Sequence, residues 1–180
     1  MTDRISYLAE GDIAVLSRSQ VIIEDKEGRP TNREIRTIRS GSSRFEKDGY
    51  THFMEKEIYE QPSVIAQNLK QYISDTGQIT LNGTNLDFSS IERVTLVACG
   101  TAFYACLTAK YWFEKLARIP VDVDVASEFR YRTPPVNANT LAIFVSQSGE
   151  TADTLAALRY CQGKAAQIWS ITNVAESSIA

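Results

Sequence analysis

The amino-acid sequence predicts an α/β protein built on a doubly wound parallel sheet. From residue 93 onward, short β-type runs alternate with longer helical segments, which is the order that βαβ units produce. The strand segments are near-continuous apolar runs rather than alternating ones, as expected where helices cover both faces of a sheet. The chain has 180 residues and is 43% apolar, so it can bury a sizeable core.

The first part of the chain is predicted to form short strands and then a linker. Apolar β-type runs occur at residues 13–16 and 21–24, and residues 25–30 supply a polar turn with glycine and proline. Residues 39–49 offer little that a core can bury, so we place a linker there, with a boundary near Asp48.

A helix is predicted after the linker. Apolar residues recur at helical spacing and share one face, namely Met54, Ile58, Ile65, Leu69 and Ile73. Pro62 lies inside this pattern, and because proline lacks a backbone donor it either bends one helix or begins a second. Residues 77–90 are rich in Gly, Asn, Ser and Asp and indicate a loop.

The predicted sheet occupies the rest of the chain. Its elements follow as strand, helix, strand, strand, helix and strand over residues 93–98, 101–116, 121–125, 140–145, 151–161 and 167–171. The pattern stops just after a strand, at Ala180. Because a parallel sheet of four strands leaves an apolar edge, we expect the natural chain to continue.

Composition argues against several classes of function. The longest apolar runs are far shorter than the roughly 20 residues that cross a bilayer, and the first residues lack the apolar stretch of a secretory signal, so a cytoplasmic protein is expected. The three cysteines and the single histidine do not form a zinc-binding pattern. The net charge of −3 argues against a nucleic-acid partner, and the arginines between residues 29 and 39 are interpreted as a solvated face.

Two loops that follow predicted strands carry candidate binding residues. The first is Cys99-Gly100-Thr101-Ala102, and the second is Ser146-Gln147-Ser148-Gly149-Glu150-Thr151. In open parallel sheets, ligands bind at the carboxyl ends of strands, where the following helices point their N-termini. We therefore expect the two loops to lie at neighbouring strand ends and to form two walls of one site.

The second loop suits a phosphate group. It places hydroxyl and amide donors around a glycine directly before a helix, from Ser146, Gln147, Ser148 and Thr151. The helix dipole contributes only ~0.3–1 kcal/mol, so hydrogen bonds of ~1.5–3 kcal/mol each to the charged acceptor must supply the rest. The loop has no lysine, and neither GxxxxGK[ST] nor GxGxxG occurs. The pattern favours a sugar phosphate over ATP or NAD, and no cofactor is predicted.

Other interpretations of single residues stay open. Ser148 could instead cap the following helix. Cys99 is interpreted as a small residue that lines the pocket rather than as a nucleophile, because no histidine partner is apparent. Cys106 and Cys161 fall inside predicted helices and are expected to be buried, and His52 is expected to serve a structural hydrogen bond rather than act as a base.

The run Ala126-Ser127-Glu128-Phe129-Arg130-Tyr131-Arg132 has two interpretations of equal weight. Glu128, Arg130 and Arg132 either make an interdomain or subunit contact near the pocket or belong to an ordinary surface helix turn.

Four strings in the sequence resemble the isomerising glutamine:fructose-6-phosphate aminotransferases, which make glucosamine 6-phosphate. They are residues 54–62 (MEKEIYEQP), 98–101 (ACGT), 126–132 (ASEFRYR) and 146–154 (SQSGETADT). Residues 7–25, which include EGDI, resemble the end of the glutaminase domain in the same family. The resemblance covers essentially the whole chain.

This resemblance implies an enzyme with two halves. The family converts fructose 6-phosphate and glutamine into glucosamine 6-phosphate and glutamate, the first step of hexosamine biosynthesis on the way to UDP-N-acetylglucosamine. The implied domains are the end of a class II glutamine amidotransferase domain at 1–47, a linker with helices at 48–90, and the first part of a sugar isomerase (SIS) domain at 91–180. A homodimer is also implied, because SIS sites in this family are completed across a dimer.

The resemblance also assigns roles to residues of this sequence. The phosphate-binding loop corresponds to Ser146, Gln147, Ser148 and Thr151, and the sugar-contacting turn corresponds to Cys99, Gly100 and Thr101. Ala102 departs from the serine that the family pattern leads us to expect. The family's glutaminase cysteine follows the initiator methionine, whereas Thr2 follows Met1 here, and the isomerase acid, base and Schiff-base lysine lie downstream of Ala180. We therefore predict no catalytic residue in this chain and no activity of the chain alone.

Two alternative functions share the phosphate loop. One is a non-catalytic SIS-type module that senses a sugar phosphate and regulates a partner, and the other is a sugar-phosphate isomerase without a glutaminase. Neither has a reason to carry residues 7–62, which resemble the domain junction of the aminotransferase.

Overall fold

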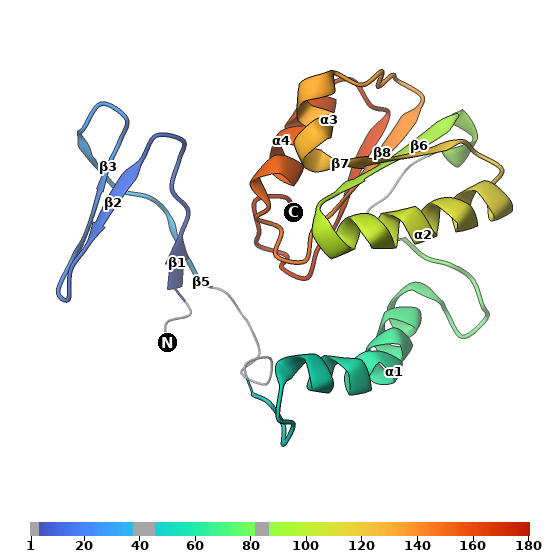
Figure 1. The fold of residues 1–180 in the computed structure, drawn as a ribbon, viewed down its shortest axis with the longest axis horizontal. Coiled ribbons are helices and arrows are strands. Elements are labelled where there is room, and N and C mark those ends of the chain that lie inside the picture. The colour runs from blue at the N-terminus through green and yellow to red at the C-terminus, as the bar shows by residue number, and fades with distance from the viewer. Residues whose placement is uncertain (1–3, 38–45, 82–86) are drawn as a thin grey trace. The chain divides into compact units, whose positions relative to one another are not determined.

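A computed structural model describes residues 4–37, 46–81 and 87–180 (Figure 1). The chain divides into two compact units, one before and one after the boundary between residues 81 and 82. Most of the predicted linker, residues 39–45, lies outside the described residues. The predicted domain boundaries at 47 and 90 stay predictions.

The first unit begins with two small antiparallel sheets. Strands β2 (Ile13–Leu16), β3 (Val21–Glu24) and β4 (Pro30–Thr31) form one of them, and β1 (Arg4–Ser6) pairs with β5 (Ile35–Thr37) in the other. The two runs predicted as strands are confirmed with their bounds. The other three strands have only two or three residues each, too few for a periodic pattern to be visible in the sequence.

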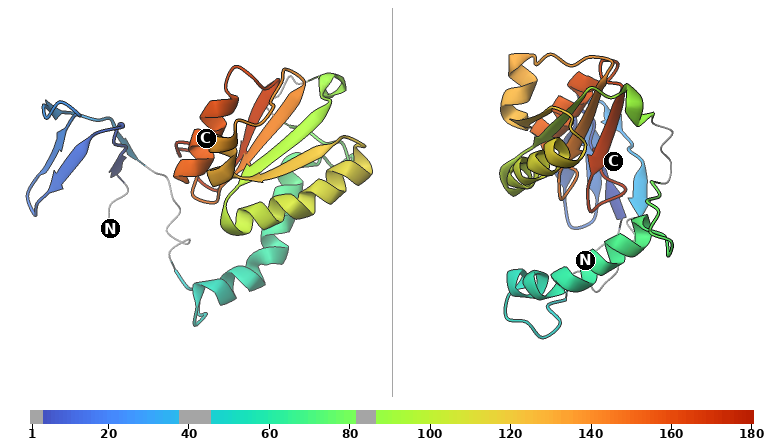
Figure 2. Two further views of the ribbon diagram at one scale, coloured as in Figure 1. Left: turned by 45° about the horizontal axis from the view of Figure 1, so that its top comes forward. Right: turned by 90° about the vertical axis from the view of Figure 1, so that its right-hand side faces the viewer.

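Helix α1 (Phe53–Tyr72) follows in the same unit. It continues through Pro62, so the alternative of two separate helices is wrong. The ribbon changes direction along its length in both Figure 1 and Figure 2, as expected for a helix with an internal proline. The apolar residues predicted on one face are largely exposed, with Met54 at 74% and Ile58 at 54%.

The second unit is the predicted parallel sheet. Its strands are β6 (Arg93–Ala98), β7 (Val121–Val125), β8 (Thr140–Val145) and β9 (Gln167–Ile171), which lie in the order β7-β6-β8-β9. All adjacent pairs are parallel, and the bounds of all four strands match the prediction.

Helices cover both faces of this sheet (Figures 1 and 2). Cys106 of α2 (Gly100–Leu116) packs in one core with Val94, Leu96 and Ile143. On the other face, α3 (Ala126–Arg132) and α4 (Ala152–Cys161) pack against Val97 and Phe144. The doubly wound fold is therefore confirmed. Its two central strands are almost completely buried because both of their faces are covered.

Three details of the second unit differ from the prediction. Helix α3 is a seven-residue helix that follows β7 directly, and its Phe129 is fully buried. Strand β7 alternates between valine and aspartate and is therefore not a continuous apolar run. It lies at a sheet edge, where one face is incompletely covered. A short 3-10 turn, η2 (Phe88–Ser90), lies within the predicted loop.

Candidate functional site

The two predicted loops leave the same edge of the sheet. Strands β6 and β8 are adjacent and parallel, and their last residues, Ala98 and Val145, are partners in the register. Residues 99–101 and 146–151 follow directly, so both loops lie at neighbouring carboxyl ends. The expected juxtaposition of the loops is confirmed, and its cause is the pairing of two buried strands.

Ser146 organises the second loop. Its side chain is buried, and its Oγ accepts a hydrogen bond of 3.1 Å from the backbone N–H of Gly149. The same Oγ lies 2.9 Å from Thr151 Oγ1, with either hydroxyl as donor. Gln147 and Ser148 are exposed, unlike Ser146. The loop therefore has a buried hydroxyl that holds its shape and two polar side chains that face solvent.

Ser148 does not cap helix α4. The N-cap residue is Thr151, and Ser148 Oγ instead accepts a hydrogen bond of 3.2 Å from the N–H of Glu150, inside the loop. Thr151 makes no side-chain capping hydrogen bond. The first turn of α4 thus points its backbone donors and the positive end of its dipole toward the loop without a side-chain cap.

Gly149 allows close approach of the last residues of the chain. Its φ of +68° lies in the left-handed region, and a Cβ placed there would be 1.9 Å from Ser177 Oγ and 2.9 Å from Thr172 Oγ1. Its carbonyl accepts a hydrogen bond of 3.0 Å from the N–H of Ile179. Glycine is required at this position by both the backbone conformation and the lack of space.

The segment after β9 packs against the second loop, a contact that the sequence did not predict. The N–H of Asn173 donates to the carbonyl of Gln147 (3.2 Å), and the N–H of Ser178 donates to Glu150 Oε1 (2.7 Å). Ser177 is 7% exposed. These contacts join residues 25 or more positions apart in the chain, and the only signal in the sequence is a serine-rich turn after the last strand.

The first loop contacts helix α4, which follows the second loop, through a cysteine sulfur. Cys99 is the half-buried N-cap of α2, and its Sγ lies 3.9 Å from the hydroxyl of Thr154, which is fully buried on α4. Gly100 has a φ of +57°, and Thr101 is exposed. Ala102 packs against the core beneath α2. Cys99 thus links the first loop to α4, and its role as a pocket-lining residue stays a prediction.

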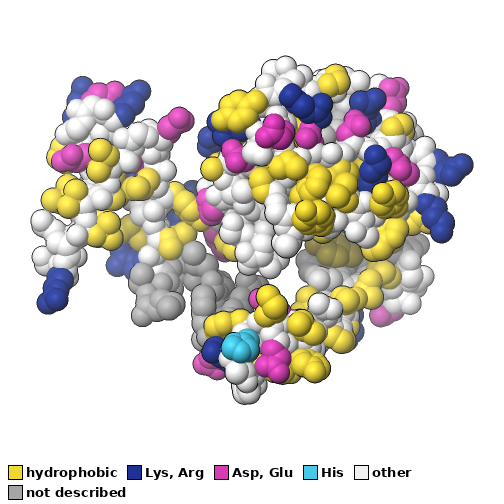
Figure 3. All heavy atoms as spheres, in the orientation of Figure 1, with side chains coloured by type: hydrophobic (Ala, Val, Ile, Leu, Met, Phe, Trp, Pro, Cys, Tyr) yellow, Lys and Arg dark blue, Asp and Glu magenta, His cyan; other side chains and the backbone are white. Residues whose placement is uncertain are grey.

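The other two cysteines are packing residues, as predicted. Cys106 is 3% exposed and Cys161 is fully buried. Desolvation raises the pKa of each thiol to about 11, which leaves very little thiolate near neutral pH. Among the described residues, no group of three metal-binding side chains forms a candidate metal site. His52 lies at the surface (cyan in Figure 3) and its side chain makes no capping hydrogen bond to α1.

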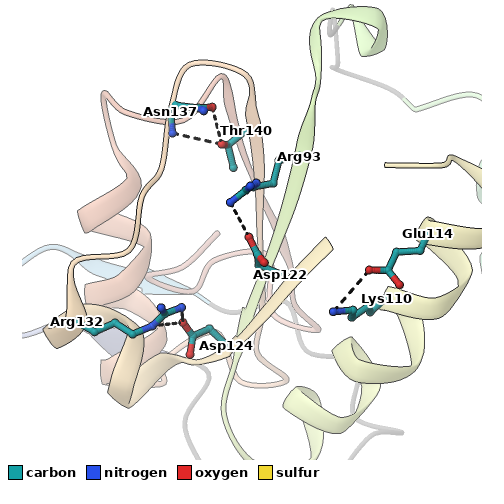
Figure 4. Close-up of polar contacts among 8 residues, drawn as sticks. All are labelled: Arg93, Lys110, Glu114, Asp122, Asp124, Arg132, Asn137 and Thr140. Atoms are coloured by element: carbon teal, nitrogen blue, oxygen red, sulfur yellow. Dashed lines mark hydrogen bonds and ion pairs between the residues drawn. The ribbon is translucent and has the colours of Figure 1, made fainter. Parts of the chain in front are cut away.

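A separate pocket of about 160 Å³ lies at the β7 edge and includes none of the predicted site residues. Figure 4 shows the two ion pairs of this region, Arg93 with Asp122 and Arg132 with Asp124. The distance from Arg93 Nη1 to Asp122 Oδ2 is 3.1 Å. Because these charges neutralise one another, the pocket presents no net charge from them to a ligand.

Arg130, on the same helix as Arg132, has a different partner. Its Nη1 donates to Asp153 Oδ1 at 3.0 Å, so α3 is tied to the first turn of α4. Glu128 is exposed. The interpretation of this run as a surface helix turn fits α3, and the interdomain or subunit contact stays a prediction.

Comparison with known proteins agrees with this arrangement. The model of the SIS domain family matches residues 87–180, which is more than half of the chain. The chain belongs to the SIS domain family, whose match covers the whole parallel sheet and both loops.

Similarity to individual curated proteins is more specific than the match to the family model. The chain is 50% identical over 180 residues to the isomerising glutamine--fructose-6-phosphate aminotransferase of Brucella abortus, and 48% identical over 183 residues to that of Zymomonas mobilis. These alignments cover 99% and 100% of this chain and 30% of each relative. The chain therefore spans about 30% of the length of the curated relatives that it matches.

A solved structure has the same fold. The C-terminal domain of glucosamine-fructose-6-phosphate aminotransferase from Francisella tularensis matches with a TM-score of 0.69 and 44% identity, covering 74% of this chain and 38% of that one. A glucosamine-6-phosphate deaminase from Thermotoga maritima shares the fold at 24% identity, with a TM-score of 0.54.

Proposed function

We propose that this chain supplies the sugar-phosphate-binding loops of an isomerising glutamine:fructose-6-phosphate aminotransferase. The reaction converts fructose 6-phosphate and glutamine into glucosamine 6-phosphate and glutamate. The observation that carries the proposal is the identity of 50% over the whole chain, which includes the residues before the SIS match. A sugar-phosphate sensor or a simple isomerase needs only the SIS part.

The second loop is proposed to bind the phosphate. Gln147 and Ser148 offer exposed donors, and the uncapped first turn of α4 adds backbone N–H groups. Each hydrogen bond to a dianion contributes ~1.5–3 kcal/mol, so two or three of them contribute roughly 3–9 kcal/mol toward binding. Ser146 and Thr151 serve the site by fixing the loop, with their hydroxyls 2.9 Å apart.

The first loop is proposed to contact the sugar. Gly100 and Thr101 are exposed at the adjacent strand end, and Cys99 lies between them and Thr154 of α4. In the proposed assignment the sugar extends from the phosphate toward residues 99–101. The groups that transfer ammonia and move the proton are proposed to lie in the part of the enzyme outside this chain.

The compartment, oligomeric state and partners of the protein are proposed to be those of the family. Among the described residues, no helix is long and apolar enough to cross a bilayer. We propose a cytoplasmic homodimer that uses neither cofactor nor nucleic acid, and sedimentation of the full-length protein tests its oligomeric state.

The test of the proposed function is a titration of fructose 6-phosphate into the full-length protein by calorimetry. Ser148→Ala is expected to weaken binding about tenfold, because one hydrogen bond to a charged group is lost. Ser63→Ala, an exposed serine on α1, is the matched control and should leave the affinity unchanged. Equal affinities of Ser148→Ala and wild type would show that the phosphate assignment is wrong.

A parallel assay separates the enzyme from the sensor. With glutamine present, the full-length protein should form glucosamine 6-phosphate, whereas residues 1–180 alone should form none. Tight binding of fructose 6-phosphate without any turnover of the full-length protein would favour the sensor.

A further inference from the structure

Asp153 places a negative charge beside the proposed phosphate loop. It lies in the first turn of α4, two residues after Thr151, which closes the loop. A carboxylate in this position interacts favourably with the helix dipole as long as the site is empty. When a phosphate dianion binds at the same helix end, the carboxylate and the phosphate repel each other.

Arg130 forms an ion pair with Asp153. Its Nη1 donates to Asp153 Oδ1 at 3.0 Å, and the two side chains are 34% and 41% exposed. Partly exposed ion pairs contribute little to stability, so the pair is poorly explained as a stabilising device. Because the pair lies at the start of α4, its charges act on any anion that binds in the loop.

Arg130 is held in place by the packing of α3. The preceding residue, Phe129, is fully buried and meets the ring of Tyr160 on α4 edge to face, with the ring centroids 5.9 Å apart. The Arg130 guanidinium lies over the ring of Tyr131, 4.7 Å from its centroid. Tyr160 in turn donates to the carbonyl of Pro134 at 3.1 Å, which ties the segment after α3 to α4. The guanidinium is therefore directed at Asp153 before any ligand arrives.

We propose that Arg130 is a positioning residue for phosphate binding, which neutralises Asp153 and so lets the N-terminus of α4 accept a dianion. This inference rests on the proposed function of the loop. It predicts that the two charges act as a pair, so that the loss of one is compensated by the loss of the other.

The test uses calorimetric titration of fructose 6-phosphate and, separately, inorganic phosphate into the full-length protein. Arg130→Met should weaken binding of either anion about threefold to tenfold, the range of one charge at a partly solvated site at low salt. Asp153→Asn alone should strengthen binding. The double variant should return to within about twofold of wild type, and Arg130→Lys should retain most of the affinity.

The chain offers a matched control on the same helix. Arg132 has the same side chain and pairs with Asp124 of β7, so Arg132→Met removes an equivalent ion pair that does not touch α4. Its affinity should equal that of wild type. The defect of Arg130→Met should also shrink as the salt concentration rises from 50 mM to 500 mM, because the effect is electrostatic.

Several outcomes contradict the proposal in distinguishable ways. If wild type binds phosphate and Arg130→Met binds equally well, the pair has no effect on the site. If the double variant is as weak as Arg130→Met, the arginine acts through packing and not through charge. If Arg130→Met fails to fold, Asp153→Asn still tests the proposal. An affinity of Asp153→Asn equal to that of wild type also contradicts it. A wild type that binds neither anion overturns the proposed function itself.

Discussion

At the scale of single residues, Gly149 and Ser146 determine the shape of the candidate phosphate loop. Ser146 was recognised in the sequence as a donor, but its hydroxyl is directed into the loop and not toward solvent. The sequence could not show this, because the distinction depends on which side the backbone turns at Gly149. The contact between Cys99 and Thr154 was equally invisible, since it joins residues 55 positions apart.

Gly149→Ala should disrupt the loop. The new methyl group would meet Ser177 well inside contact distance, and the left-handed backbone would cost a further ~1 kcal/mol or more. We expect a fall in the melting temperature and at least a tenfold loss of fructose 6-phosphate affinity. Gly163→Ala is the control, because Gly163 has a φ of +72° but no atoms within 4 Å of the added Cβ. Equal effects of the two substitutions would show that the contact with Ser177 is unimportant.

The ion pair of Asp12 and Arg33 predicts a pH effect in the first unit. Arg33 donates to both carboxylate oxygens of Asp12 at 2.7 Å, and this hydrogen bonding lowers the pKa of Asp12 from its usual 3.8. Because the folded-state pKa is lower than the unfolded one, the pair stabilises the fold fully above the unfolded pKa. This contribution is lost as the pH falls through the lowered value.

Asp12→Asn should therefore reduce the dependence of stability on pH below about 4. Urea unfolding at a series of pH values from 6 to 2.5 measures it. Glu34→Gln, which removes an exposed ion pair with Arg36, is the control and should leave the profile unchanged. A profile of Asp12→Asn that follows wild type would exclude the role of this pair.

At the scale of elements, the sequence predicted best the strands that are buried on both faces. Strands β6 and β8 were found with their bounds because both of their faces are buried and their residues are almost all apolar. Helix α3 was not predicted as an element, because its seven residues make only two turns and its single fully buried aromatic, Phe129, gives no periodicity. The returning segment after β9 was missed for a similar reason, since its role comes from contacts with a distant loop.

Pro62 is the feature of α1 that is best tested by substitution. It removes one backbone hydrogen bond inside a helix of 20 residues. Pro62→Ala should restore that bond and stabilise the middle of the helix locally by up to ~3 kcal/mol. Amide hydrogen exchange at residues 58–66 should then slow roughly tenfold. Gln67→Ala, an exposed site on the same helix, is the control, and unchanged exchange in the proline variant would mean that the bend has another cause.

At the scale of the whole molecule, fold and family rest on different kinds of observation. The order of strands and helices is sufficient to predict a doubly wound sheet, and the structure confirms it. The function needed motifs outside the sheet, because a sheet of this type serves many reactions. Residues 54–62 and 146–154 carried that information, and the identity to the aminotransferases extends over both. Under the proposed function, the groups that carry out the reaction are predicted to lie outside this chain.

The aspartates of β7 have a consequence for how the protein behaves in solution. Asp122 and Asp124 alternate with valines along an edge strand, and each is paired with an arginine. Exposed edges of sheets are templates for the addition of strands from other molecules, and charges on the edge discourage this. We therefore expect the charged VDVDV strand to disfavour edge-to-edge association of the sheet with other molecules.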